Sequence, residues 1–182
     1  MLRNIKILVG YCDMIVKRSE LKLIPDSDPF LHKAPKPYDF EQHGETAELF
    51  ANVLHQKMKE FKGVGLSANQ VGIDASVFVI GVDDFRLDVF NPKIISSTGE
   101  CDYNEGCLSY IGVQIKIKRP EEITVEFYNA KGEKQERTLG GLTARIFLHE
   151  YDHMQGVTIK DHVTPLKWAV ALKKRKKSYG VA

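Results

Sequence analysis

Residues 142–156 read LTARIFLHEYDHMQG, a segment that follows Gly140-Gly141 and ends at Gly156. Glycine disfavours a helix interior and is common at helix ends, so we expect a helix from about residue 142 to residue 155. One stripe of this helix, at spacings of four, three and four, is made by Leu142, Ile146, His149 and His153. The stripe predicts an inward face that is apolar for two turns and then carries imidazoles.

The pentapeptide HEYDH at residues 149–153 is the strongest chemical signal in this helix. Positions four residues apart share a helix face, so both imidazoles can bind one metal ion. Glu150 follows the first histidine, where it can act as a general base toward a water on the metal. The alternative is a pair of ordinary surface or core histidines. Buried imidazoles need partners, however, and a metal supplies one.

A catalytic site of this type usually has three protein ligands and one open position. Downstream of the pentapeptide, Asp161 and His162 are available and no glutamate occurs. Upstream, Cys107 lies within the segment EGCLS at residues 105–109 and could present a thiolate. A lone cysteine is more often a small buried apolar residue. The residues alone therefore do not decide which side chain is the third ligand.

A glycine-containing segment at residues 63–70 reads GVGLSANQ. Glycine lets a backbone approach a ligand closely, and the amide of Gln70 could donate a hydrogen bond to a developing oxyanion. An ordinary loop that ends a helix explains the same residues. That preceding helix is predicted by apolar residues at spacings of three and four between residues 45 and 61.

The remaining pattern favours an α+β fold, because the predicted strands cluster instead of alternating with helices. Four prolines within residues 25–37 predict an extended or looped segment before the first helix. The expected strands are residues 77–80, residues 94–95 after a break at Asn91-Pro92, residues 111–117, residues 123–127 and, across a turn at 129–132, residues 134–139.

A last helix is expected from residue 166 to about residue 177, started by Thr164-Pro165. We expect four side chains to anchor it, namely Leu166, Trp168, Val170 and Leu172. The chain carries a net charge of +2, yet six basic residues lie between positions 167 and 177 and no acid follows Asp161. This basic tail is either a solvated helix end or a contact with an anionic partner such as RNA.

The 182 residues fit one domain, expected to span residues 1–182. Residues 1–20 form an N-terminal extension of uncertain structure, an added strand or a disordered segment, and Met14 is an alternative start. No apolar run approaches the roughly 20 residues that a membrane helix needs. We therefore expect no membrane partner. Three cysteines without regular spacing argue against a disulfide framework, so we expect a cytoplasmic protein.

Together and in this order, the segments GVGLSANQ, EGCLS and HEYDH resemble the motifs of the peptide deformylase family. The resemblance runs from about residue 21 to the final helix. It implies mixed or antiparallel sheets packed around a central metal-binding helix that carries HEYDH, with a C-terminal helix. It also implies hydrolysis of the N-formyl group from the methionine that starts new polypeptides, with release of formate.

The resemblance also implies a role for individual residues. The metal ligands would be Cys107, His149 and His153. Glu150 would be the general acid and base, while Gln70 and the backbone N–H of Leu108 would hold the oxyanion. The peptide-binding residues would be Val64, Gly65, Tyr103, Leu142 and Ile146. Gly65 and the strand after Leu108 would hold the peptide backbone by strand addition.

The implied cofactor is one divalent metal ion per chain, with Fe²⁺ first and Zn²⁺, Ni²⁺ or Co²⁺ as substitutes. One thiolate and two imidazoles suit all of these ions, so the residues do not choose among them. The implied partners are N-formyl-methionyl nascent peptides and, through the basic C-terminal helix, the ribosome. Two other classes remain open, a zinc endopeptidase with a different third ligand and a non-enzymatic module that binds formyl peptides or ribosomes.

Four positions depart from the family pattern. Ile111 stands where many members have proline, and Gln114 where some have an arginine that helps bind the peptide. These two differences concern the substrate clamp and leave the metal site unaffected. Leu148 replaces a common glutamine, and Ser67 replaces a common alanine.

Overall fold

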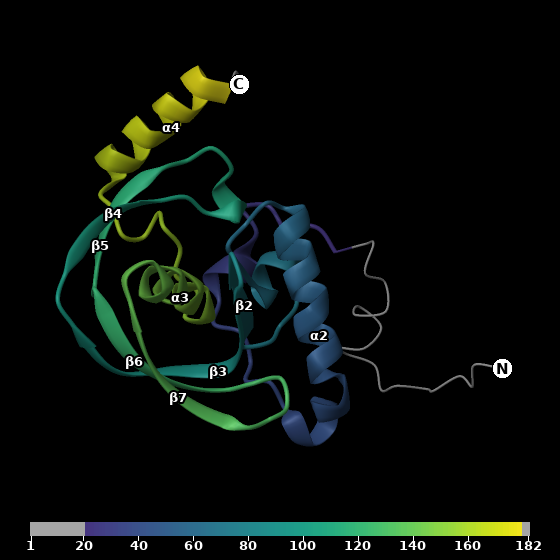
Figure 1. Ribbon diagram of the computed structural model, residues 1–182. Helices are drawn as coiled ribbons and strands as arrows, with labels where there is room; N and C mark the ends of the chain where they lie inside the picture. The colour runs from purple at the N-terminus through teal and green to yellow at the C-terminus, as the bar shows by residue number, and fades with distance from the viewer. Residues whose placement is uncertain (1–20, 180–182) are drawn as a thin grey trace.

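The computed structural model describes residues 21–179 (Figure 1). The expectations for residues 1–20 and 180–182 lie outside the described residues. In chain order, the helices and strands are η2 Pro29–His32, α2 Phe40–Glu60, β1 Gly65–Ser67, η3 Ala68–Val71, β2 Val77–Val82, β3 Phe85–Thr98, β4 Cys101–Glu105, η4 Leu108–Tyr110, β5 Ile115–Arg119, β6 Glu122–Tyr128, β7 Lys134–Gly140, α3 Gly141–Met154 and α4 Pro165–Tyr179. This is the expected α+β combination of strands and helices.

Two antiparallel sheets form the framework of the molecule. The larger has the order β1-β2-β3-β6-β7, and the smaller pairs β4 with β5. The expected hairpin between β6 and β7 is confirmed, and its turn contains Gly132 at a φ of 77°. In β6 the residues alternate between buried and more exposed positions, as a strand with one covered face requires.

The short apolar run VFVI at residues 77–80 lies in β2 and is buried on both faces. Val77 and Val79 pack with the buried face of α2, whereas Phe78 and Ile80 pack with α3. Both sides of β2 are therefore covered by a helix, which explains the lack of alternation in its sequence. Figure 1 shows α3 inside the curve of the strands and α2 on the far side of β2.

The predicted break at Asn91-Pro92 is wrong, because β3 continues through it from Phe85 to Thr98. The pairing with β6 shifts register between Phe90 and Lys93, and Asn91 has a φ of 49°. A bulge leaves residues unpaired, so it accommodates a proline that cannot donate a ladder hydrogen bond. The expected strand at residues 94–95 is the continuation of β3.

The strand expected at residues 111–117 begins only at Ile115. Before it, η4 forms at Leu108–Tyr110, and Ile111 is 64% exposed instead of facing a core. The alternation of apolar and polar residues predicted a strand, but the backbone N–H of Val113 donates to the carbonyl of Tyr110 within a turn.

The segment at residues 63–70 contains β1 and η3, so it is more than a loop. Strand β4 was not predicted.

Helix α2 begins at Phe40, five residues before the expected start, because Asp39 caps it. The carboxylate of Asp39 accepts hydrogen bonds from the backbone N–H groups of Glu41 and Gln42 at 2.9 and 3.1 Å. Its buried face carries the apolar residues that predicted the helix, among them Phe50, Leu54 and Met58.

Helix α4 is attached by fewer side chains than expected. Trp168 and Leu172 pack against the cluster around Tyr110, whereas Leu166 and Val170 are 76% and 46% exposed. The prediction that all four residues anchor the helix is therefore wrong for two of them, because only one face of the helix meets the β5 side of the molecule. Figure 1 shows α4 projecting from the body. Within residues 21–179, no helix is long and apolar enough to cross a membrane.

Candidate metal centre

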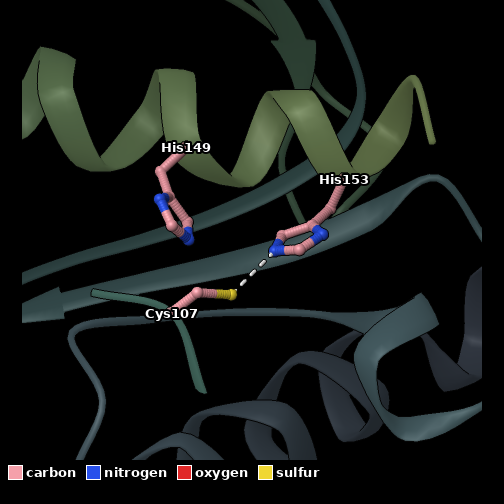
Figure 2. A group of neighbouring side chains, drawn as sticks. All are labelled: Cys107, His149 and His153. Carbon is pink, nitrogen blue, oxygen red and sulfur yellow. Dashed lines mark hydrogen bonds between the residues drawn. The ribbon is translucent and has the colours of Figure 1, made fainter. Parts of the chain in front are cut away.

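Three side chains from distant segments meet beside α3. Cys107 precedes η4, and His149 and His153 project from one face of α3 (Figure 2). One ligand atom from each residue lies within 4.8 Å of the others, and the Cys107 Sγ is 3.4 Å from the His153 Nε2. Cys107 and His153 are buried, and His149 is partly exposed toward a cavity. The geometry therefore selects the upstream cysteine as the companion of the two histidines.

The two downstream candidates for a third ligand are engaged elsewhere. The carboxylate of Asp161 accepts hydrogen bonds from the N–H and hydroxyl of Thr158, both at 2.8 Å. The Nε2 of His162 lies 2.6 Å from the carboxylate of Asp152. Neither residue joins the cluster, and a zinc endopeptidase site with a downstream third ligand does not fit this arrangement.

The thiol and the imidazoles of the cluster shift one another's pKa. Burial alone raises the pKa of the Cys107 thiol, but the positive charges of His153 and His149 outweigh it and hold the pKa well below its usual range. Burial lowers the pKa of His149, and the Cys107 thiolate reverses this and raises the pKa well above its usual range. One thiolate with two imidazoles is a donor set that zinc, iron, nickel and cobalt share.

A charged network behind His149 holds that ring in place. The Nδ1 of His149 lies 2.9 Å from a carboxylate oxygen of Glu105, so its Nε2 is left for the cluster. Arg119 binds both oxygens of Glu105, at 2.6 and 3.0 Å, and Arg145 binds one of them at 3.0 Å. Burial opposes the charge on Glu105, but the hydrogen bonds from His149 and Arg119 prevail and lower its pKa to about 2.

The network continues to the far end of the HEYDH segment. Arg119 also donates to the carboxylate of Asp152 at 2.7 Å, and Asp152 in turn faces His162. Sequence reasoning assigned no role to Glu105, Arg119, Arg145 or Asp152. Glu105 could have been suspected from its place in the EGCLS segment. The spacing of Arg119 and Arg145 does not predict their contacts with Glu105, because they lie 14 and 40 residues from it in the sequence.

Glu150 has a different environment from Glu105, although it also faces the cavity. It is 4% exposed, and burial raises the pKa of its carboxyl above the usual range. Its carboxylate accepts a hydrogen bond from the hydroxyl of Ser67. A Cβ added at Gly65 would overlap the same carboxylate, so a larger residue at position 65 would displace the Glu150 side chain from this place. The glycine expected to contact a peptide therefore also makes room for Glu150.

Gln70 lies beside the cluster and is buried. Its Nε2 donates to the Cys107 Sγ at 3.5 Å and to the Ser109 hydroxyl at 3.0 Å, while its Oε1 accepts from the N–H of Ser67. Leu108 lines the same cavity from η4. A further contact from η3 was not predicted, in which the Asn69 amide donates to the carbonyl of His153 at 2.8 Å.

These groups open onto a cavity of about 820 Å³ that all expected peptide-binding residues line. Val64, Tyr103 and Leu142 are each about half exposed, whereas Ile146 is buried. Leu142 belongs to the inward stripe predicted for α3, and it is half exposed because this end of the stripe faces the cavity. Ile111 and Gln114, two of the four positions singled out in the sequence, line the cavity as well.

Comparisons with known proteins agree with this arrangement. A family model described as polypeptide deformylase matches residues 20–169. A peptide deformylase of Thermotoga petrophila is 38% identical over 148 residues, which cover 81% of this chain and 89% of the relative. One of Neisseria gonorrhoeae is 36% identical over 163 residues, with 86% and 96% of the two chains covered.

Solved structures show the same likeness. A peptide deformylase from Legionella pneumophila aligns with a TM-score of 0.79 and 34% identity over 86% of this chain and 93% of that one. A peptide deformylase from Synechococcus elongatus, solved in complex with actinonin, aligns with a TM-score of 0.80 and 33% identity over 90% and 87% of the two chains. The residues that the family model matches, 20–169, include the segments that hold Gln70, Cys107 and the histidines of α3.

Proposed function

The chain belongs to the peptide deformylase family and is a hydrolase that removes the N-formyl group from nascent peptides, and we propose that Cys107, His149 and His153 hold its metal. The observation that carries the proposal is the meeting of these three ligand atoms within 4.8 Å beside Glu150. Family membership makes the activity metal-dependent. Fe²⁺ is the proposed native ion, with Zn²⁺, Ni²⁺ or Co²⁺ as substitutes.

An ion held by these three residues would supply Lewis acidity toward the formyl carbonyl and toward water. The chain's own residues supply the remaining steps. Glu150 takes a proton from the attacking water and delivers it to the leaving amine. Its buried position supports this role, because a carboxyl with a raised pKa can both accept and release a proton.

Gln70 and the backbone N–H of Leu108 are the proposed donors to the oxygen of the formyl group as charge develops on it. Support comes from the Nε2 of Gln70, which lies 3.5 Å from the Cys107 Sγ and thus beside the proposed metal position. Its Oε1 is tied to the N–H of Ser67, which fixes the amide orientation with the donor end toward the cavity.

The cavity walls supply the proposed binding site for the methionine side chain. Val64, Tyr103, Leu142 and Ile146 present apolar surface around the opening. We place the peptide backbone along Gly65, because β1 is an edge strand of the larger sheet. No strand forms directly after Leu108, because β5 begins only at Ile115, so the proposed strand addition relies on β1.

Three wider proposals accompany this activity. Residues 1–182 are proposed to form one catalytic domain that works in the cytoplasm, where nascent chains emerge. The basic tail of α4 is proposed to contact the ribosome, supported by the run of five basic residues from Lys173 to Lys177. Deletion of residues 173–182 should then weaken co-sedimentation with ribosomes, most visibly at low salt, without slowing hydrolysis of short formyl peptides.

The deciding experiment is anaerobic purification, followed by metal analysis and by measurement of formate release from a formyl-methionyl peptide. We expect about one metal ion per chain and release of formate. The matched acetyl-methionyl peptide should release no acetate. Cys107→Ala should lose the metal, whereas replacement of the exposed Cys101 with alanine should not. Full metal binding by Cys107→Ala would overturn the proposed ligand set.

A further inference from the structure

Strand β1 offers two alternate residues to the side chain of Glu150. Residues i and i+2 of a strand point to the same face, and Gly65 and Ser67 are such a pair. A Cβ on Gly65 would overlap the Glu150 Oε1, and the Ser67 hydroxyl donates to the Oε2. The carboxylate therefore lies flat along the strand, with one oxygen over residue 65 and the other at residue 67.

Ser67 is connected to a second group of the site through its main chain. Its backbone N–H donates to the Oε1 of Gln70 at 3.0 Å, and the residue is completely buried. The side chain of Ser67 thus contacts the proposed proton carrier, while its backbone contacts the proposed oxyanion donor. Removal of the hydroxyl alone separates these two connections, because the backbone hydrogen bond does not need it.

The last torsion of a glutamate side chain has broad, roughly twofold preferences, so burial alone does not orient the carboxylate. Within residues 21–179, no side chain other than Ser67 donates a hydrogen bond to the Glu150 carboxylate. The hydroxyl engages the Oε2, which leaves the Oε1 as the oxygen without such a donor. A hydrogen bond to a charged acceptor is among the stronger ones in proteins.

We propose that Ser67 is a positioning residue that fixes the carboxylate of Glu150 for proton transfer. The inference rests on the proposed function of Glu150. Without the hydroxyl, the last torsion of the Glu150 side chain would keep its twofold freedom, whereas the hydrogen bond from Ser67 selects one orientation.

The test compares Ser67→Ala in the wild-type protein and in Glu150→Gln, with a formyl-methionyl peptide as substrate. In the wild-type background, kcat should fall about ten- to a hundredfold, with KM and metal content unchanged. In Glu150→Gln, the same change should cause little further loss, because the hydroxyl acts through the carboxylate. An equal loss in both backgrounds, or a change mainly in KM, would overturn the proposal.

A second measurement does not depend on turnover. A crystal structure of metal-loaded Ser67→Ala should show a rotated or multiply oriented Glu150 carboxylate and an unmoved Gln70, and an unmoved carboxylate contradicts the proposal. As a control, Thr158→Val removes another buried hydroxyl, one that bonds to Asp161, and should leave kcat unchanged. An inactive wild-type protein would refute the proposed function, whereas an active one that is insensitive to Ser67→Ala refutes this inference alone.

Discussion

The two buried glutamates that line the cavity, Glu105 and Glu150, have opposite electrostatic environments. Both lose hydration, which by itself raises the pKa of a carboxyl. Around Glu105, the hydrogen bonds from His149 and Arg119 reverse that effect and bring the pKa to about 2. Around Glu150, burial prevails over the two nearby imidazoles and the pKa is raised.

This difference separates a structural carboxylate from one suited to proton exchange. A group held ionised at every working pH can orient a ligand ring and balance buried cations, but it cannot carry a proton. A group with a raised pKa can exchange a proton near neutral pH. The same side chain therefore serves two purposes, and its neighbours decide which one. The two substitutions to glutamine should have different consequences.

The largest expected effect belongs to Glu150→Gln. An amide cannot accept the proton of the attacking water, so kcat should fall by roughly 10²–10⁴-fold. Metal content and the unfolding midpoint should stay close to those of the wild-type protein. Steady-state formate release with parallel metal analysis measures this, and the exposed Glu48→Gln serves as the control. Near-full activity would show that Glu150 is not the proton carrier.

Glu105→Gln should affect metal affinity and not the proton transfer. Loss of the charge behind His149 should weaken metal binding by about ten- to a hundredfold. When saturated with metal, the variant should keep most of its kcat. Competition with a chelator of known affinity gives the dissociation constant, and the exposed Glu100→Gln is the matched control. If metal affinity stayed unchanged while kcat collapsed, the roles assigned to the two glutamates would be reversed.

Arg145→Met tests how far stability depends on the charged side of the cavity. Arg145 donates to Glu105 and to the backbone carbonyls of Ile117 and Cys101 at 3.0, 3.1 and 2.6 Å. Its loss leaves buried acceptors unpaired, so the free energy of unfolding should fall by about 1–3 kcal/mol. Urea unfolding measures the change. The exposed Arg137→Met should alter it by less than about 0.5 kcal/mol, and equal effects would contradict the buried network.

The smallest effect concerns Asp88, a carboxylate outside the cavity. Burial raises its pKa, but hydrogen bonds from His55 and Arg86 outweigh this and lower it below the usual value. A lowered folded-state pKa stabilises the protein above the unfolded-state pKa, and the contribution is lost as pH falls through the folded-state value.

Replacement of Asp88 by asparagine should therefore reduce stability by about 1 kcal/mol or less at neutral pH and flatten the decline in acid. Thermal unfolding of the wild-type protein and the variant between neutral and acidic pH measures both effects. The exposed Asp84→Asn is the control. An unchanged acid profile would show that cationic partners do not govern this carboxylate.

Much of the fold and the site could be inferred from local patterns. The helix that carries HEYDH, the hairpin of β6 and β7 and the pair of histidines proposed as metal ligands follow from spacings of four or two residues. Such spacings reflect geometry within a single helix or strand, so a linear sequence records them directly. Cys107 required the family resemblance, because no local spacing relates it to residues 149–153.

Only the tertiary structure showed which residues contact Glu105 and Glu150. Arg119 and Arg145 reach Glu105 from β5 and α3, and Ser67 reaches Glu150 from β1, a separation of 83 residues. Burial of a charge requires partners, but any element that packs nearby can provide them, so the sequence contains no fixed interval for them. Strand pairing also turned Asn91-Pro92 into a bulge, and a turn between η4 and β5 placed residues 111–114 in the cavity wall. The sequence thus specifies which groups are proposed for the chemistry, and tertiary packing specifies the partners and orientation of each group.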